Sequence, residues 1–401
     1  MKEPKLRFPE FTDDWKQYKF GDIFTVSQGL QIPIDKRFLE DGENRFFYIT
    51  NEFLKDTCST AYYIENPSPS VLCNNEDILM TRTGNTGIVV TNVSGCFHNN
   101  FFKIKYDNHN FSKNYIYYLL NTKRMQNTIL KNAGSSTIPD LSHKSFYQIT
   151  GYFPKQLMEQ EKIGSLLLNI DNLIQSAQKE LEGYRELKQG MLQKMFPKKG
   201  ETTPEIRFPE FTGDWEKRKI EDWGTFYYGR SCPKWSVTAD ATTPCIRYGE
   251  LYTKFGTKVD KVYSHTNVST DKLKFSKGTE VLIPRVGEDP MDYNHCTWLS
   301  IPNVAIGEMI SVFNTEQNPL FTATMFNATL RKEFAMRVEG GSVTNLYFDE
   351  LKNIEVAFPN KEEQIKISSF FAELDNLITS QQQELDGYKE LKKGLLQQMF
   401  C

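Results

Sequence analysis

Residues 181–196 read LEGYRELKQGMLQKMF and residues 385–400 read LDGYKELKKGLLQQMF, so the chain contains almost the same segment twice. Leu, Gly-Tyr, Glu-Leu-Lys and Met-Phe stand at matching places in both copies. The copies start 204 residues apart, which is the size of a domain and not the short period of a solenoid array. The match therefore indicates an internal duplication into two halves.

Two further segments recur in the same order. RFPEFTDDW at 7–15 returns as RFPEFTGDW at 207–215, with only Asp13 changed, to Gly213. EDILMTRTGNTG at 76–87 loosely matches GTEVLIPRVGED at 278–289, which aligns Arg82 with Arg285. Each half thus has a closely matched start, a divergent body and a closely matched tail.

The two tails predict long helices. Apolar residues follow each other at alternating steps of three and four, the spacing of a coiled-coil seam. Each tail follows a Phe-Pro pair, and proline is tolerated in a first helical turn. We expect two rods of roughly 60 Å that pack antiparallel and also bind partners. The residues of this seam are Ile163, Leu167, Ile170, Ile174, Leu181, Tyr184 and Met191, with Ile367, Phe371, Leu374, Ile378, Leu385, Tyr388 and Leu395.

Matched residues interrupt the seams. Lys188 and Lys392 stand at the same interruption, and the glycines inside the helices also recur. Each glycine costs roughly 1 kcal/mol of helix stability relative to alanine. This cost indicates a close backbone approach, either where the rods cross or to a partner. The glycines are Gly183, Gly190, Gly387 and Gly394.

We predict an α+β fold: two globular mixed α/β domains joined by two long antiparallel coiled-coil helices, with a pseudo-twofold internal repeat. Short β-rich pieces separated by turn residues read as strands at 46–50, 77–81, 87–93 and 101–106. A helix is expected near 112–131, with Ser112 as its N-cap. The expected segments are the first globular domain 1–153, spacer helix 154–197, linker 198–204, the second globular domain 205–358 and spacer helix 359–401.

Composition excludes several classes. A hydrophobic content of 39% in 401 residues suits two packed domains. The sequence shows no signal peptide and no apolar run near the ~18–20 residues that span a bilayer. Seven scattered cysteines argue against a disulfide framework or a structural zinc site and favour the cytoplasm. A net charge of −3 means that any nucleic-acid contact needs local positive charge or a partner.

No segment predicts catalysis, a metal site or a cofactor in this chain. Asn318-Pro319-Leu320-Phe321 resembles the base-holding loop of adenine methyltransferases, but the second proline and a glycine-rich nucleotide loop are missing, so a turn is favoured. Pro139-Asp140 could begin a nuclease cluster, but the nearby Glu186-Leu187-Lys188 lies on the predicted rod. Asp289, Asp292, His295 and Cys296 mix oxygen and sulfur donors and lack counterparts in the first half. Neither a Walker loop nor a nucleophile elbow occurs.

The Phe-Pro-Glu-Phe start followed by Trp, the DILMTRTGNTG segment and the Gly-Tyr-Arg/Lys-Glu-Leu-Lys tail resemble specificity (S) subunits of type I restriction-modification enzymes, most closely staphylococcal members. The resemblance covers essentially the whole chain. It implies two target recognition domains, each reading one half of a bipartite asymmetric DNA site. The helices would set the spacer and bind two methyltransferase (M) subunits.

The same resemblance implies a larger complex that directs adenine methylation and restriction. Restriction (R) subunits would join through it. S-adenosylmethionine would sit on M, and ATP and Mg on R.

Base reading needs Arg, Lys, Asn, Gln, Ser or Thr at loop tips. Arg82 and Arg285 are retained in both halves, which favours a phosphate contact or a role in the fold over base reading. The candidates in the first body are Gln28, Gln31, Lys36, Arg37, Arg82, Asn85, Ser135 and Ser136, and those in the second are Arg230, Lys234, Arg247, Arg285 and Ser342.

Two alternatives remain open: a scaffold that holds two partner proteins without DNA, and a self-contained restriction-methylation enzyme. The repeated nonapeptide is expected to pack at a junction between domain and helix and not to touch DNA. Its aromatic residues are Phe8, Phe11 and Trp15, with Phe208, Phe211 and Trp215.

Overall fold

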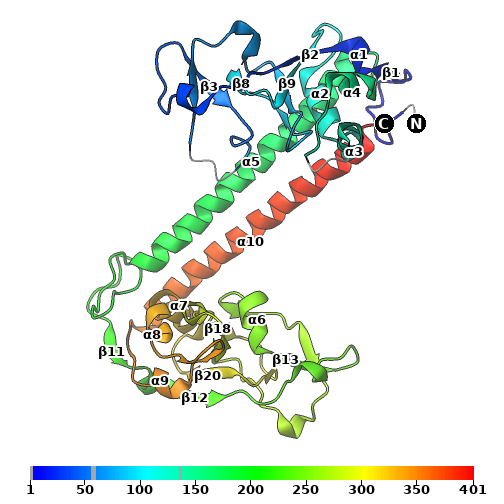
Figure 1. The fold of residues 1–401 in the computed structure, drawn as a ribbon. Helices are drawn as coiled ribbons and strands as arrows, with labels where there is room; N and C mark the ends of the chain where they lie inside the picture. The colour runs from blue at the N-terminus through cyan, green and yellow to red at the C-terminus, as the bar shows by residue number, and fades with distance from the viewer. Residues whose placement is uncertain (1–2, 56–59, 135–137) are drawn as a thin grey trace. The chain divides into compact units, whose positions relative to one another are not determined.

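The structure, a computed structural model, describes residues 3–55, 60–134 and 138–401. It divides into two compact units (Figure 1). Unit 1 comprises Met1–Lys179 and Gln382–Cys401, and unit 2 comprises Glu180–Gln381. Within the described ranges, no helix has the length and apolarity needed to cross a membrane.

Unit 1 builds two four-stranded sheets and one two-stranded ribbon from its described residues. The first sheet has the order β2-β9-β6-β7, and the second has the order β4-β3-β8-β5 with β3 parallel to β8. The ribbon pairs β1 with β10. The strands are β1 Lys16–Lys19, β2 Phe24–Gln28, β3 Arg45–Ile49, β4 Tyr63–Glu65, β5 Leu72–Cys73, β6 Ile78–Thr81, β7 Val89–Val90, β8 Gly95–Phe97, β9 Phe101–Tyr106 and β10 Thr150–Phe153.

Unit 2 repeats this plan with a larger main sheet, in the order β12-β20-β16-β18-β14. A second sheet has the order β15-β13-β19, a third has β17-β22-β21, and β11 pairs with β23. The strands are β11 Glu216–Lys219, β12 Gly224–Tyr228, β13 Thr243–Ile246, β14 Lys258–Val259, β15 Ser264–Thr266, β16 Glu280–Pro284, β17 Val286–Gly287, β18 Thr297–Leu299, β19 Ala305–Ile306, β20 Ile310–Thr315, β21 Glu339–Gly340, β22 Thr344–Asn345 and β23 Glu355–Phe358.

The helix expected near 112–131 is in fact two helices. Ser112 caps the first, as predicted, by accepting from the backbone N–H of Tyr115. Thr122 ends it and starts the second, because its hydroxyl accepts from the N–H of Met125 at 3.2 Å. The α-helices are α1 Phe20–Ile23, α2 Lys113–Asn121, α3 Lys123–Ala133, α4 His143–Gln148, α5 Leu157–Lys194, α6 Tyr248–Thr253, α7 Pro319–Thr329, α8 Arg331–Ala335, α9 Phe348–Leu351 and α10 Lys361–Gln398.

The long helices α5 and α10 each contain 38 residues and each begins in one unit and ends in the other. In unit 1, Leu167 shares a core with Phe400, and Asp171 pairs with Lys392. In unit 2, Phe196 stacks on Phe371. Within each unit the two helix segments therefore run antiparallel. Each of the five predicted segments is one continuous stretch of sequence, whereas unit 1 combines two separate stretches. The boundaries of the predicted segments therefore stay a prediction.

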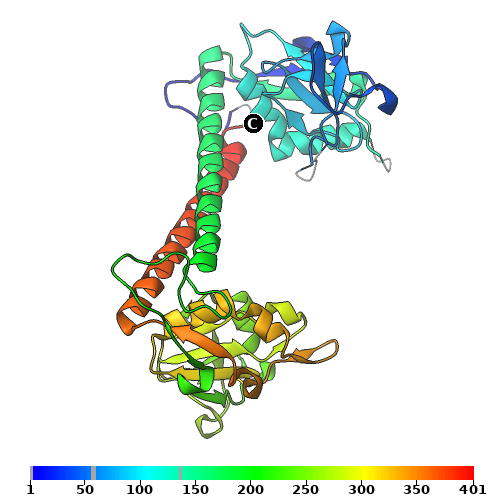
Figure 2. The same ribbon diagram turned by 90° about the vertical axis from the view of Figure 1, so that its left-hand side faces the viewer.

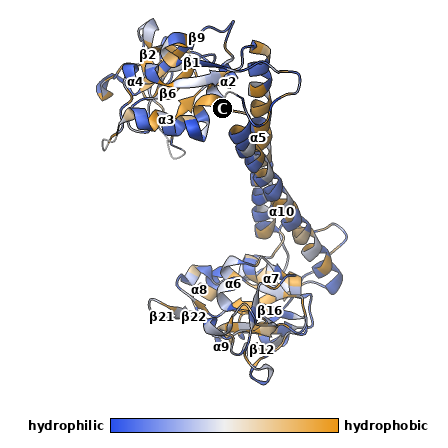
Figure 3. Cartoon of the chain, turned by 90° about the vertical axis from the view of Figure 1, so that its right-hand side faces the viewer, coloured by the Kyte–Doolittle hydropathy of each residue, from blue (hydrophilic) through white to orange (hydrophobic). Residues whose placement is uncertain are grey.

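Each core is closed by the two residues that directly follow a long helix. In unit 1, Met399 and Phe400, which follow α10, pack with Trp15 and Tyr115. In unit 2, Met195 and Phe196 pack with Trp215 and Phe321 in the same way. Figure 2 shows the sheets and helices of each unit from a second side, and Figure 3 shows hydrophobic residues alternating with hydrophilic ones along α5 and α10. Burying one such large apolar side chain contributes about 1.5–3 kcal/mol.

Candidate nucleic-acid interface

The two aligned arginines occupy the same backbone position in both units. The N–H of Arg82 donates to the carbonyl of Asn100 at 2.7 Å, and the N–H of Leu141 donates to the carbonyl of Arg82. In unit 2, the N–H of Arg285 donates to the carbonyl of Met309 at 3.1 Å, and the N–H of Leu346 donates to the carbonyl of Arg285. Asn100 therefore corresponds to Met309. We call Arg82 and Arg285 the framework arginines.

The side chain of Arg82 is held within unit 1. Its Nη2 donates to Asp140 Oδ2 at 2.8 Å, and its Nε donates to the carbonyl of Leu141 at 3.4 Å. Asp140 also accepts from the Thr83 hydroxyl. The Arg82 guanidinium lies 5.5 Å from the Phe102 ring. Asp140 of the Pro139-Asp140 segment is therefore the acid of this ion pair, and a fold-supporting role for Arg82 fits these contacts.

The side chain of Arg285 has a different setting. Its Nη2 lies 2.8 Å from the sulfur of Met309, and its guanidinium lies 4.9 Å from the Tyr228 ring and 5.9 Å from the Tyr347 ring. Its Nε is buried with no hydrogen-bond partner among the described residues. Burial raises the pKa of the Tyr228 hydroxyl, and the charge of Arg285 opposes this with a smaller lowering effect.

Some candidate side chains of unit 1 already form hydrogen bonds with backbone carbonyls of the same unit. Arg37 donates twice to the carbonyl of Ile32 and lies 5.2 Å from the Tyr48 ring. Gln28 donates to the carbonyl of Asn99 at 3.0 Å. The exposed candidates are Gln31, Lys36 and Asn85, whereas Ser135 and Ser136 lie outside the described residues.

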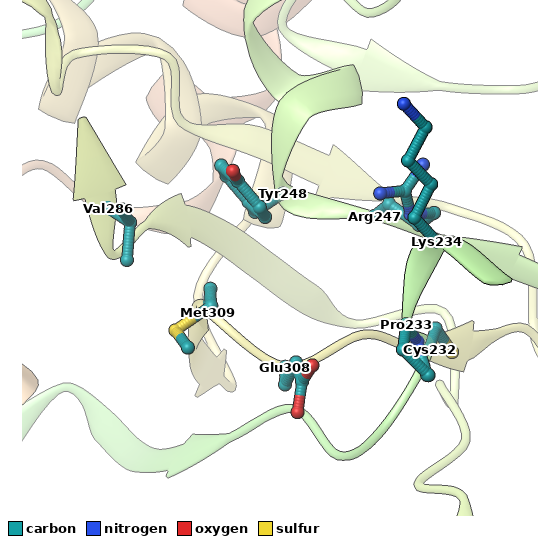
Figure 4. Close-up of a pocket in the computed structure, with 8 residues that line it drawn as sticks. All are labelled: Cys232, Pro233, Lys234, Arg247, Tyr248, Val286, Glu308 and Met309. Atoms are coloured by element: carbon teal, nitrogen blue, oxygen red, sulfur yellow. The ribbon is translucent and has the colours of Figure 1, made fainter. Parts of the chain in front are cut away.

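In unit 2, candidates gather around a pocket of about 260 Å³ (Figure 4). Lys234 stands on the 3-10 helix Lys234–Ser236, and Arg247 immediately precedes α6. Glu308 lines the same pocket together with Met309, Tyr248, Val286, Cys232 and Pro233. Arg230 and Ser342 are exposed but do not line it. Glu308 was not among the predicted residues, because only cations, amides and hydroxyls were expected to read bases, and carboxylates were not.

The repeated nonapeptide fixes each body to a long helix. Arg7 donates from Nε and Nη2 to the carboxylate of Glu159 at 2.7 and 2.9 Å, and Arg207 binds Glu363 at 2.7 Å twice. The hydrogen bond to Glu159 raises the pKa of Arg7.

The aromatic residues of the nonapeptide belong to the same junction. Trp15 and Trp215 are buried in the two cores, and Phe8 and Phe208 pack against them. Phe11 is buried and Phe211 is half-buried. These positions match the expected junction.

Along the helices, the predicted seam is buried or half-buried, with Leu167 fully covered and Tyr184 partly exposed. Other leucines are exposed at matched places. Leu173 and Leu377 are each 45% exposed, and Leu187 and Leu391 are 41% and 50% exposed. These pairs offer the same apolar groups twice.

The glycines do not mark a crossing of the helices. A Cβ placed on Gly183, Gly190 or Gly387 meets no described atom within 4 Å, and one on Gly394 reaches only the Gln398 side chain at 4.0 Å. The expectation of a close crossing was therefore wrong, because both helices leave open space there. A close approach to a partner stays a prediction.

No catalytic or metal-binding arrangement is seen in the described residues. Asn318 is not in a simple turn: its side chain accepts from the N–H of Phe321 at 2.8 Å and caps α7. His295 lies 2.9 Å from Asp292, but Cys296 is buried, and in the described ranges no three His, Cys, Asp or Glu side chains gather as metal ligands.

Comparison with known proteins gives the same match in both halves. The sequence pattern of the type I restriction modification DNA specificity domain matches residues 12–183 and again residues 212–387. Two similar proteins come from Methanocaldococcus jannaschii. The type I restriction enzyme MjaVIII specificity subunit is 22% identical, over 98% of this chain and 92% of its own. The MjaIX specificity subunit is 21% identical, over 95% and 86%.

Solved structures share the fold. The S subunit of a type I restriction-modification system from M. genitalium has a TM-score of 0.65 at 14% identity, over 100% of this chain and 99% of that one. A chain from a study of complex assembly and conformational transition of a type I system has a TM-score of 0.52 at 14% identity, over 95% and 96%. The predicted α+β fold with two repeated domains is confirmed.

Proposed function

We propose, from the premise that this chain belongs to the family of type I restriction-modification DNA specificity domains, that each of its two units reads one half of a bipartite, asymmetric DNA site. One observation carries the proposal: the framework arginines keep identical backbone bonds while the side chains around them differ. A shared scaffold with divergent loops is what two readers of different base sequences require. We assign the chain the role of a specificity subunit without catalytic activity of its own.

The long helices supply the proposed partner surface. Each offers an open glycine pair and two exposed leucines at matched positions, so the same partner would bind twice. We propose that two methyltransferase subunits bind there and that restriction subunits join through the complex in the cytoplasm. A helix of 38 residues is about 57 Å long, and we propose that it sets the non-specific spacer between the half-sites.

Cofactors are assigned to the partners in this proposal. S-adenosylmethionine would be bound by M, and ATP with Mg by R, while this chain supplies DNA contacts. Its mildly acidic net charge of −3 is compatible with that division, since phosphate contacts can be shared with M and concentrated in local basic loops.

The test is reconstitution with the M subunit followed by mapping of methylated adenines over random DNA. The expected result is one bipartite motif with a fixed spacer, dependent on this chain. Methylation without a bipartite motif would favour the scaffold that holds two proteins without DNA readout. Methyl transfer by the purified chain alone would favour a self-contained enzyme.

A further inference from the structure

Equivalent loop positions around the framework arginines carry different chemistry in the two units. The N–H of Gly29 donates to Phe101 in β9, and that of Gly229 donates to Ile310 in β20. Ile49 pairs with Phe97, as Ile246 pairs with Ile306. These registers align Ile34, Thr50 and Asn99 of unit 1 with Lys234, Arg247 and Glu308 of unit 2. The first set is uncharged and the second consists of two cations and one carboxylate.

The three charged residues line the 260 Å³ pocket of unit 2. Lys234 and Glu308 are exposed and Arg247 is half-buried. Lys234, Arg247 and Glu308 come from different segments that line this pocket, and the Glu308 carboxylate lies apart from the two cationic side chains (Figure 4). In the described part of the chain none of the three forms an ion pair, whereas Arg82 of unit 1 is paired with Asp140.

Backbone geometry holds Glu308 in place. Met309, the next residue, has φ 65°, a left-handed conformation that is uncommon for a residue other than glycine. Gly307, on the other side, leaves no room for a side chain, since a Cβ there would lie 2.7 Å from the carbonyl of Ile246. The carboxylate therefore projects from a defined point of the loop that lines the same pocket as the two cations.

Resting on the proposed function, we infer that this pocket reads one G·C base pair of the second half-site. Arg247, with Lys234, donates to guanine O6 and N7, and Glu308 accepts from the N4 amino group of cytosine. A site made only for phosphate would gain nothing from an exposed carboxylate, which repels the DNA backbone. A carboxylate and two cations that line one pocket match the major-groove edge of a G·C pair, which offers acceptors on guanine and an amino donor on cytosine.

The test uses the reconstituted complex with the M subunit and duplexes carrying each of the four base pairs at every position of the second half-site. The wild-type complex is expected to prefer G·C in one orientation at one position. Glu308→Gln is expected to lower that preference roughly 5- to 100-fold at that position alone. Arg247→Lys keeps the charge but loses the two-pronged donor, and is expected to relax the same position.

Glu316→Gln is the matched control, because Glu316 is exposed just beyond the other end of β20. It should leave the motif unchanged. A bipartite motif with no specified G·C pair in its second half overturns this inference and leaves the proposed function standing. A uniform loss of methylation by the Glu308→Gln variant, with unchanged base preference, also overturns the inference and leaves the proposed function standing. The lack of any bipartite motif contradicts the proposed function itself.

Discussion

Lys392 Nζ lies 2.5 Å from the carboxylate of Asp171, which joins the last turns of α10 to the first half of α5. Asp171 also accepts from the buried Tyr118 hydroxyl at 2.7 Å, so the same carboxylate ties both helices to α2. Lys188 and Asp375 form the corresponding ion pair in unit 2. The lysines that interrupt the heptad seam are thus paired across the helices in both units.

Asp171→Asn is expected to destabilise the protein more than Asp375→Asn. The first change weakens an ion pair and a hydrogen bond of a buried tyrosine, with a cost of about 1–3 kcal/mol. The second weakens only a partly exposed pair, with a cost of about 0–1 kcal/mol. Urea unfolding of both variants gives the comparison. Equal losses would show that Tyr118 contributes nothing to the contact.

Glu159→Ala should cost more unfolding free energy than Glu363→Ala. Both carboxylates are buried and bind an arginine, but Glu159 also accepts from the Trp15 indole at 3.1 Å, whereas the Trp215 indole has no described partner. The extra charged hydrogen bond predicts a difference of about 1.5–3 kcal/mol. Denaturant unfolding measures it, and an unchanged DNA motif in both variants is expected because the junction does not read bases.

Leu187→Asp and Leu391→Asp are expected to reduce the M:S stoichiometry from two to one, and the double variant should abolish M binding. A buried leucine contributes about 1.5–3 kcal/mol, which a charge would remove and reverse. Analytical ultracentrifugation with the M subunit measures the stoichiometry. Leu39→Asp, at an exposed leucine away from the long helices, is the control. Full binding by the double variant would place the M site elsewhere.

Arg82→Ala should weaken binding to all DNA sequences and make the salt dependence shallower, since a residue retained in both halves suits phosphate or fold support. Arg285→Ala should change the salt slope more, by about one unit, because Arg285 has no ion pair among the described residues whereas Arg82 is held by Asp140. Binding isotherms at several salt concentrations test both. A changed half-site with an unchanged slope would make either arginine a base reader.

The ionised Glu333 carboxylate is expected to contribute to the free energy of unfolding near neutral pH and to lose this contribution in acid. Its hydrogen bond with Lys199, then that with Arg337, lowers its pKa below the usual 4.5, despite an opposing effect of burial. A lowered folded-state pKa stabilises the protein above about 4.5, and this contribution is lost as pH falls through the folded value. The difference in unfolding free energy between wild type and Glu333→Gln should be constant from about pH 7 to 5 and shrink below 4.5. A constant difference down to pH 3 would contradict it.

The long helices could be predicted because a heptad seam is a local pattern, and Leu167 and Phe371 are buried as it requires. The framework arginines could be predicted because arginine stands at the matching position in both halves of the sequence. The boundary between α2 and α3 at Thr122 could not be predicted, because a threonine inside an apolar stretch does not by itself indicate a helix cap. Glu308 could not be predicted either, because Glu308 and Arg247 line one pocket only through the pairing of β13 with β19, which are far apart along the chain.

The sharing of α5 and α10 between the units has a consequence for protein synthesis. Met399 and Phe400 complete the core of unit 1, yet the ribosome makes them only after all of Glu180–Gln381. At about 5–20 residues per second, that interval is on the order of 10–40 s. The domain translated first is therefore the one finished last, and its open core must stay soluble, or be sheltered by a chaperone, until the final helix emerges.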